Sequence, residues 1–221
     1  MSHDIRVSDN PATEVAERLT EVAMDGGQIV LTGGSSPQRA YELAAQRDGD
    51  WGSATIWFTD ERCVGPTDPD SNYGMADRAL LSRAAGATVH RMHGELGPED
   101  GAAAYENELG EFGPAALDLI LLGVGPDAHI CSLFPGDDAL GERERLVVGV
   151  ETPGMAPLVS RITLTLPVVN ASRQIVFLVT GEDKAEAAAR VFAGRPDPRA
   201  PGSLVEGDAI ALLDPAAAAR L

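Results

Sequence analysis

A single histidine, His129, lies two residues beyond the turn Gly-Pro-Asp at residues 125–127. The apolar stretch LDLILLGV, residues 117–124, precedes this turn and predicts a buried strand, so His129 belongs to a loop at that strand's carboxyl end. An imidazole titrates near neutral pH and suits general-base catalysis, with Asp127 available to hold the ring. A packed loop histidine fits the same spacing.

Cys131, two residues beyond His129, is the other reactive group in this stretch. A thiolate beside the histidine would be a nucleophile, whereas a buried cysteine is more often an inert packing residue. The second cysteine, Cys63, is distant and forms no CxxC spacing. We therefore expect two free thiols in a reducing compartment, with Cys131 packed in the core.

The segment TGGSSP, residues 32–37, lies between a predicted strand and a predicted helix. Gly33 and Gly34 allow a sharp turn and a close approach of the backbone to a ligand, while Ser35 and Ser36 supply hydroxyl and N–H donors. The amino end of the following helix would stabilise an anion. The pattern is neither GxGxxG nor GxxxxGKS, so it does not predict dinucleotide or P-loop binding. A turn capped by serine fits it equally well.

Four charged residues are further candidates for a site. Asp60 and Arg62 in TDERC follow a predicted strand, where a carboxylate could orient a group or accept a proton and a guanidinium could bind an oxyanion. Arg161 begins the strand RITLTLP, and Lys184, the only lysine of the chain, begins a helix. The alternative for each is a solvated surface charge. That alternative is weakest for Lys184, because a chain that otherwise uses arginine retains one compact ammonium group.

The remaining histidines do not predict a metal centre. His90 and His93 form an HxxH spacing that could combine with His129, but no cysteine or acidic residue stands at a supporting spacing. His3 is expected to be a flexible terminal residue. We therefore predict that the chain binds no metal.

These candidates are positioned by alternating strands and helices. Strands are predicted at residues 28–34, 54–58, 87–92, 117–124, 161–167, 173–181 and 209–214, and helices at 14–25, 37–47, 71–84, 98–111, 182–194 and 215–221. The alternation predicts a three-layer, Rossmann-like doubly wound α/β fold with a mainly parallel sheet, formed by residues 1–221 as a single domain. Residues 59–70 are expected to form a polar loop. Because ligands bind beyond the carboxyl ends of such strands, we expect TGGSSP, TDERC and GPDAH to meet in one crevice.

Composition narrows the class of protein. The 221 residues are 44% hydrophobic, enough for a sizeable core, and they lack a membrane-length apolar run and a signal-peptide pattern. The formal net charge of −17 disfavours nucleic acid and anionic membranes as partners. We expect a soluble cytoplasmic protein, a monomer or weak dimer, that holds any anionic substrate with a local basic cluster. The acidic, lysine-poor composition fits either a high-salt interior or coding bias.

Five segments together resemble the 6-phosphogluconolactonase family, within the wider group that includes glucosamine-6-phosphate deaminase. They occur in the family's order over about residues 30–190 and read LTGGSSP, WFTDERCVGPTDPDSNYGMA, LDLILLGVGPDAHICSLFPG, SRITLTLPVVN and FLVTGEDKA. The resemblance implies hydrolysis of 6-phospho-D-glucono-1,5-lactone to 6-phosphogluconate in the oxidative pentose phosphate pathway, without a cofactor. It implies that His129 activates water, and our own hypothesis adds that Asp60 or Asp127 helps to orient the site. The residues that the resemblance implies in phosphate binding are Arg62, Arg161, Lys184 and the loop residues Gly34, Ser35 and Ser36, and Gly33 joins them as a candidate from the loop pattern.

Two other functions stand as alternatives to the lactonase. In the deaminase a glutamate follows the histidine by five residues, and Phe134 occupies that place here, so the acid needed for ring opening is missing. The second alternative is a non-catalytic sugar-phosphate-binding protein. Such regulators often carry an added DNA-binding domain, which does not fit in 221 residues at a charge of −17.

One departure from the family pattern is Ala128, where glycine is usual. If φ is positive at this position, alanine costs about 1 kcal/mol relative to glycine.

Overall fold

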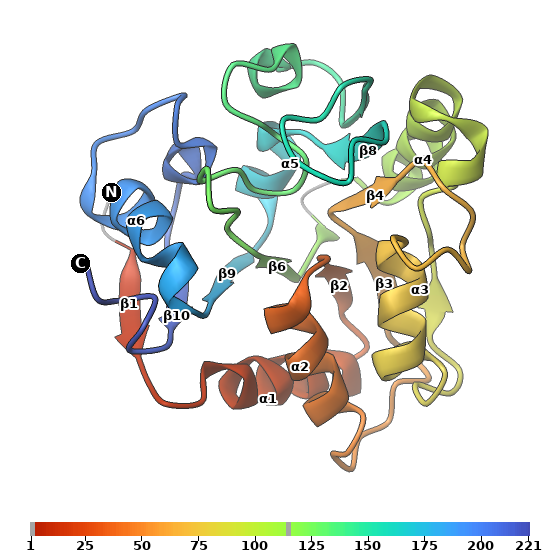
Figure 1. The fold of residues 1–221 in the computed structure, drawn as a ribbon. Helices are drawn as coiled ribbons and strands as arrows, with labels where there is room; N and C mark the ends of the chain where they lie inside the picture. The colour runs from red at the N-terminus through yellow and green to blue at the C-terminus, as the bar shows by residue number, and fades with distance from the viewer. Residues whose placement is uncertain (1–2, 114–115) are drawn as a thin grey trace.

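The computed structural model describes residues 3–113 and 116–221, and these residues contain a seven-stranded sheet and a three-stranded sheet (Figure 1). All neighbouring strands of the large sheet pair in parallel, in the order β1-β10-β9-β6-β2-β3-β5. Its strands are β1 (Asp4–Val7), β2 (Gln28–Leu31), β3 (Thr55–Phe58), β5 (Thr88–Val89), β6 (Leu119–Leu122), β9 (Gln174–Val179) and β10 (Ala209–Leu213). The predicted α/β fold with a mainly parallel sheet is confirmed.

The strand order reverses between β2 and β6. The chain runs outward from β2 to β3 and β5 on one side, then returns to β6 and runs outward to β9 and β10 on the other. Connections on the two sides therefore diverge at this point and leave a crevice beyond the carboxyl ends of β2 and β6. The topology places a ligand site at that end of the sheet.

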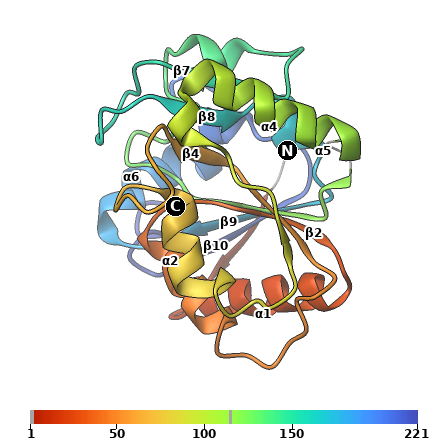
Figure 2. The ribbon, with the colours of Figure 1, turned by 90° about the vertical axis from the view of Figure 1, so that its right-hand side faces the viewer.

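Helices cover both faces of the large sheet, which gives three layers (Figure 2). Side chains alternate between the faces: Ile29 and Leu31 of β2 pack in one hydrophobic cluster, and Val30 packs in the other. The first cluster includes residues of α1 (Pro11–Met24), α2 (Ser35–Ala44) and α3 (Asn72–Ala76). The second includes residues of α4 (Pro98–Phe112), α5 (Leu166–Ala171), α6 (Ala185–Ala188) and the small sheet.

The small sheet pairs β4 (Asp60–Arg62), β8 (Arg161–Leu164) and β7 (Val147–Val150) in antiparallel fashion. The prediction that residues 59–70 form a loop is therefore wrong for β4. Its three charged residues are poor strand formers, and the pairing with β8 overrides that preference. β8 is also buried along its whole length rather than half-buried. Its polar side chains are covered by other segments: Arg161 lines a pocket, and Thr163 accepts the N–H of Ser132 from the loop after β6.

Other elements differ from the sequence predictions at places where local patterns are weak. β1, β7 and α5 were not predicted. The predicted helix at 215–221 is a series of turns, because a seven-residue alanine-rich end is too short to be helical by propensity alone. The predicted helix at 71–84 is α3 followed by a π-helical turn at Asp77–Leu81, and the one at 182–194 is α6 between a 3₁₀ turn and a π-helical turn.

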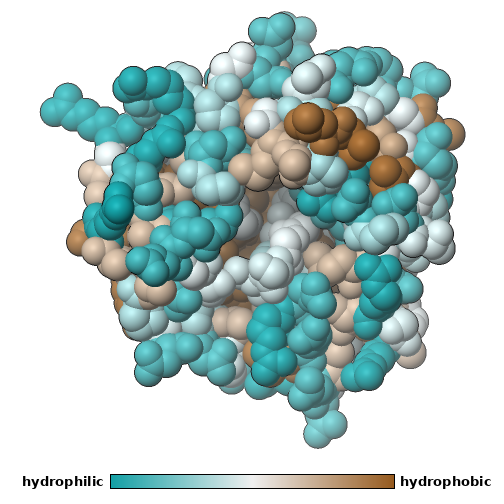
Figure 3. Space-filling view, in the orientation of Figure 1, coloured by the Kyte–Doolittle hydropathy of each residue, from teal (hydrophilic) through white to brown (hydrophobic). Residues whose placement is uncertain are grey.

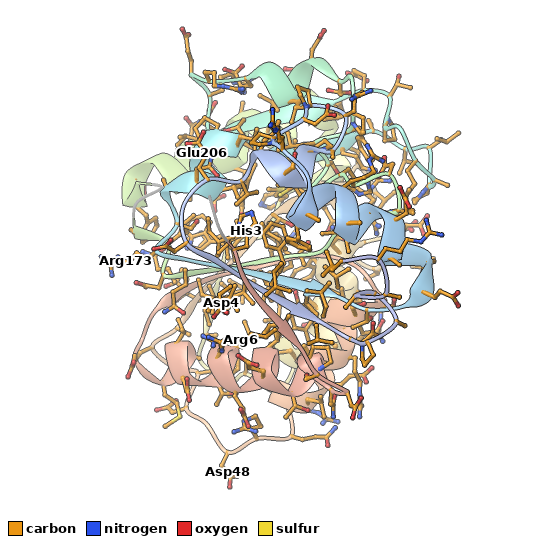
Figure 4. All side chains as sticks on the ribbon, turned by 90° about the vertical axis from the view of Figure 1, so that its left-hand side faces the viewer. His3, Asp4, Arg6, Asp48, Arg173 and Glu206 are labelled. Atoms are coloured by element: carbon orange, nitrogen blue, oxygen red, sulfur yellow. The ribbon has the colours of Figure 1, made fainter. Side chains whose placement is uncertain are left out.

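β1 forms one edge of the large sheet, and a charge pair joins it to α1. Arg6 contacts Asp4 at 2.6 Å and Glu14 of α1 at 2.8 Å (Figure 4). His3 packs edge-on against Phe177 and Phe192, with ring centroids 6.0 and 5.8 Å away, so the expected flexible terminal residue is a packed one. Within the described ranges, no helix has the length and apolarity needed to cross a membrane.

Candidate active site

A pocket lies beyond the carboxyl ends of β2 and β6, where the strand order reverses, and Figure 3 shows the surface hollowed near the centre of this face. The three loops that were predicted to meet in one crevice all contribute to it. The lining residues include 32–34 after β2, Asp60 and Arg62 of β4, 123–126 and His129 after β6, Arg161 of β8, Lys184 after β9, and Asn72 of α3.

The glycine loop after β2 requires its two glycines. Gly34 has a φ of +110°, which L side chains rarely adopt. A Cβ atom on Gly33 would lie 2.0 Å from Oδ1 of Asn72. Because Gly33 has no side chain, the Asn72 amide can occupy the space beside the loop.

The two serines predicted to bind substrate begin α2 and are not among the residues that line the pocket. The hydroxyl of Ser36 lies 2.5 Å from Oγ1 of Thr180, which ties the start of α2 to the end of β9. The first turn of a helix has unpaired N–H groups that favour an anion. We therefore expect Ser35 and Ser36 to contribute to binding through their backbone rather than their hydroxyl groups.

Asp60 is a buried carboxylate that is held by hydrogen bonds from three side chains. It accepts from Oγ of Ser132 at 2.6 Å, Oγ1 of Thr59 at 2.9 Å and Nδ2 of Asn72 at 3.3 Å. Ser132 belongs to the His129 loop, and its N–H donates to Oγ1 of Thr163 in β8. Asp60 therefore connects the histidine loop, β4 and α3, and it is fixed in position. Sequence spacing carried no signal for Ser132 or Asn72.

Glu61 points away from Asp60 and Arg62, as alternation along β4 requires. Its carboxylate accepts four hydrogen bonds, and the donors are the backbone N–H groups of Arg62, Asn72 and Tyr73 and the hydroxyl of Ser71. Burial raises the pKa of Glu61, and these donors oppose that shift. Glu61 anchors the start of α3 to β4 and so positions the pocket residues on both elements.

Arg62 and Arg161 are directly opposite each other on the antiparallel strands β4 and β8. Arg161 is buried and donates to the carbonyls of Val159 at 3.1 Å and Pro157 at 2.9 Å. Burial lowers the pKa of Arg161; Asp60 opposes the shift and Arg62 adds to it. Like charges at facing positions of a sheet repel, so an anion bound between them would relieve this repulsion.

Lys184 supplies a third cation from the turn after β9. Its Nζ lies 3.7 Å from Asp183, whose side chain is 70% exposed, so this ion pair is weak and leaves the ammonium group available to a ligand. The side chain of Lys184 itself is mostly buried. A chain with a net charge of −17 thus gathers three cations in one pocket, which is a local field suited to phosphate.

His129 is held by Asp127 at the rim of the loop after β6. Nδ1 of the imidazole lies 2.6 Å from Oδ1 of Asp127, and the same oxygen accepts the backbone N–H of His129 at 3.1 Å. The ring packs against Phe134 with centroids 4.6 Å apart. A Cβ atom on Gly125 would lie 2.1 Å from Nδ1, so only glycine admits the ring at this position.

Asp127 is suited to orienting the imidazole as a carboxylate. Burial alone would raise the pKa of Asp127, but the hydrogen bonds and charge interaction with His129 outweigh burial, and the pKa lies below its ordinary value. An ionised Asp127 favours the tautomer with the proton on Nδ1. Nε2 is then the free acceptor on the ring.

Ala128, where the family pattern has glycine, has a φ of +73° and is fully buried. Replacing it with glycine should leave the free energy of unfolding within about 1 kcal/mol of wild type. Relief of about 1–2 kcal/mol of left-handed strain offsets the lost methyl burial and the greater freedom of unfolded glycine. Ala128→Val should lose about 3 kcal/mol or more, because a branched side chain fits neither the backbone angle nor the space. Urea unfolding of both variants measures this; a loss above about 2 kcal/mol for Ala128→Gly contradicts it.

The remaining sequence candidates do not add reactive groups. Cys131 lines the pocket, but burial raises the pKa of its thiol well above the usual value and Asp60 adds to the shift, so the thiol stays protonated. His90 and His93 each contact a glutamate and are not among the lining residues. The pocket therefore combines the His129–Asp127 pair with three cations.

Comparisons with known proteins point to one family. A family model described as glucosamine-6-phosphate isomerases/6-phosphogluconolactonase matches residues 5–213. A 6-phosphogluconolactonase of Synechocystis sp. is 38% identical over 221 residues, which cover 94% of this chain and 90% of the relative. The structure of 6-phosphogluconolactonase from Trypanosoma cruzi has a TM-score of 0.84 and 27% identity, covering 100% of this chain and 98% of that chain. A monomeric glucosamine-6-phosphate deaminase has a TM-score of 0.85 with 18% identity over both whole chains, a likeness of fold alone.

Proposed function

The chain belongs to the family of glucosamine-6-phosphate isomerases and 6-phosphogluconolactonases, and we propose that it hydrolyses 6-phospho-D-glucono-1,5-lactone to 6-phospho-D-gluconate. The family resemblance predicted from the five sequence motifs is confirmed. One observation carries the choice of reaction: an imidazole held at 2.6 Å by a carboxylate shares a pocket with three cations. A lactone phosphate needs a base at one end and an anion anchor at the other.

His129 is the general base in this proposal. Nε2 takes a proton from water as the water oxygen bonds to C1 of the lactone, and the C1 carbonyl becomes a tetrahedral oxyanion. Collapse of that intermediate breaks the bond between C1 and the ring oxygen. The imidazolium returns its proton to the departing ring oxygen, which gives the open-chain acid. A positioned base of this kind contributes about 10²–10⁴-fold to the rate.

Asp127 and Asp60 have different supporting roles. Asp127 keeps the proton on Nδ1 and stabilises the imidazolium while it holds the water proton. Asp60 already accepts hydrogen bonds from Ser132, Thr59 and Asn72, so in this proposal it orients the loops rather than accepting a proton.

The phosphate is held by Arg62, Arg161 and Lys184 together with the backbone at the start of α2. Nε of Arg62 is buried and has no hydrogen-bond partner among the described residues, which leaves it available to a phosphate oxygen. Guanidinium groups bind phosphate through paired N–H donors, and an ammonium group adds a compact charge. Anchoring the phosphate fixes the lactone carbonyl near His129 and lowers the entropy cost of reaction.

Replacement of Lys184 by methionine tests the anchor. We expect the KM for the lactone to rise about 10- to 100-fold with kcat within about threefold of wild type, because the lost charge-assisted contact is made in both ground and transition states. Lys184→Arg, which keeps the charge, should recover part of the loss. Initial rates over a range of lactone concentrations measure both constants, and an unchanged KM in Lys184→Met would remove Lys184 from the anchor.

A lactone hydrolysis assay, corrected for spontaneous hydrolysis, tests the function as a whole. Turnover above background by the wild-type chain supports the lactonase. Tight binding of 6-phosphogluconate without turnover would instead support a non-catalytic sensor. Release of ammonia from glucosamine 6-phosphate would support the deaminase, which is disfavoured because the buried ring of Phe134 stands where the deaminase has its glutamate.

A further inference from the structure

Asn72 is a buried pocket residue whose amide is held at one end. It begins α3, where its backbone N–H donates to Glu61 at 2.7 Å, and the residue is 2% exposed. Nδ2 donates to the carbonyl oxygen of Asp60 at 2.8 Å and to Oδ1 of Asp60 at 3.3 Å. Both partners are acceptors, so a flipped amide would face oxygen with oxygen, and the orientation of the side chain is fixed.

The other end of this amide has no partner. Oδ1 of Asn72 is buried and receives no hydrogen bond from any described residue. It lies beside Gly33, where a Cβ atom would come within 2.0 Å, and both residues line the pocket. A buried acceptor without a donor costs free energy, so a ligand that supplies the donor gains an interaction that water-exposed groups do not offer.

The chemistry of the proposed substrate limits what this donor can be. The phosphate and the lactone carbonyl of 6-phosphogluconolactone are acceptors at neutral pH, and only the ring hydroxyl groups donate. We propose that Oδ1 of Asn72 accepts a hydrogen bond from a secondary hydroxyl of the lactone ring and so selects substrates that carry it. This inference rests on the proposed function, because it takes the sugar lactone as the occupant of the pocket.

The test compares the native lactone with its 2-, 3- and 4-deoxy analogues on wild type and Asn72→Ala. For one analogue, wild type should lose about 5- to 100-fold in kcat/KM, because the buried acceptor is left unpaired. Asn72→Ala should lose that discrimination, so that its kcat/KM for the native lactone divided by its kcat/KM for this analogue is near one. The same ratio for each of the other two analogues should be as in wild type. A purely structural role would lower activity on every substrate equally and leave all the ratios unchanged. Asn72→Ser provides the same measurement if the alanine variant folds poorly.

Ser132→Ala is the matched control, because it also removes one hydrogen bond to Asp60 but leaves Oδ1 of Asn72 in place. Its activity should fall while its ratios stay as in wild type. The inference is overturned if Asn72→Ala keeps the wild-type ratio for every analogue, or if wild type discriminates against none. Dissociation constants of 6-phosphogluconate and its deoxy forms give the same ratios without turnover. A chain that binds them with the expected pattern but hydrolyses no lactone would overturn the proposed function and leave this inference standing.

Discussion

Replacing His129 with glutamine is expected to lower kcat for lactone hydrolysis by about 10²–10⁴-fold, with KM within about threefold of wild type. Glutamine keeps polar atoms in the loop but cannot take a proton from water near neutral pH. The proposed phosphate anchor on β4, β8 and the turn after β9 is untouched, so binding should persist. Stopped-flow or pH-stat rates, corrected for spontaneous hydrolysis, measure the change.

His93→Gln is the matched control for this experiment. It makes the same chemical replacement at a histidine that does not line the pocket, and it should keep wild-type rates. Circular dichroism and thermal unfolding establish that His129→Gln remains folded. Near-normal turnover by a folded His129→Gln variant would remove His129 as the base.

Asp127→Asn is expected to have the second large effect, a loss in kcat of up to about 10⁴-fold. The amide can present its NH₂ group to Nδ1, which shifts the imidazole proton to Nε2 and blocks the atom that should accept the water proton. The side chain stays nearly the same size, so the loop and the contact with Phe134 should be retained. Comparing the rates of Asp127→Asn and Asp127→Glu separates the effect of the carboxylate charge from that of side-chain length. An activity of Asp127→Asn within about threefold of wild type would contradict the orienting role of Asp127.

The pH dependence of stability gives an independent measure of the same pair. The pKa of Asp127 in the folded protein lies below its ordinary value of 3.8, because the interactions with His129 outweigh burial. A carboxyl group of this kind stabilises the fold above its unfolded pKa, and the contribution disappears as pH falls through the lower folded value. The part of the stability difference between wild type and Asp127→Asn that comes from this carboxyl group should therefore be lost as pH falls below about 4. A difference that keeps growing as pH falls from about 4 to about 2 would show that the carboxylate is not held as described.

The strand-end loops of the site could be predicted from sequence because each follows a strong local pattern. The runs before Thr32 and Gly123 are apolar enough to predict buried parallel strands, and parallel strands bring their carboxyl ends to one edge. His129 and Lys184 could be singled out because each is a rare residue type at the end of such a strand. These residues line the pocket as that reasoning expected.

Arg62 and Arg161 were candidates from sequence, but their facing arrangement and the presence of the buried amide in the site could not be predicted in the same way. Arg62 and Arg161 lie 99 positions apart, and their opposition depends on a second antiparallel sheet whose strand β4 has no strand-forming composition. Asn72 is a pocket residue because Glu61 anchors α3 beside β4, which is a contact between a side chain and backbone donors that sequence spacing does not reveal.

Sequence and tertiary structure each explain a different part of the role of Ala128. Sequence comparison with the family pattern marked it as a departure from glycine, and the backbone angle of +73° identifies the strain that the departure brings. Only the fold reveals that the extra methyl group is buried and contributes packing in return.

The sequence by itself determined the fold class, the family and the identity of the histidine, because apolar periodicity and glycine turns act over a few residues. Tertiary structure decided which charges face the pocket and which oxygens are left without donors. Those properties depend on strand register, helix anchoring and burial between distant segments, and they orient a loop histidine in a pocket that also holds three cations.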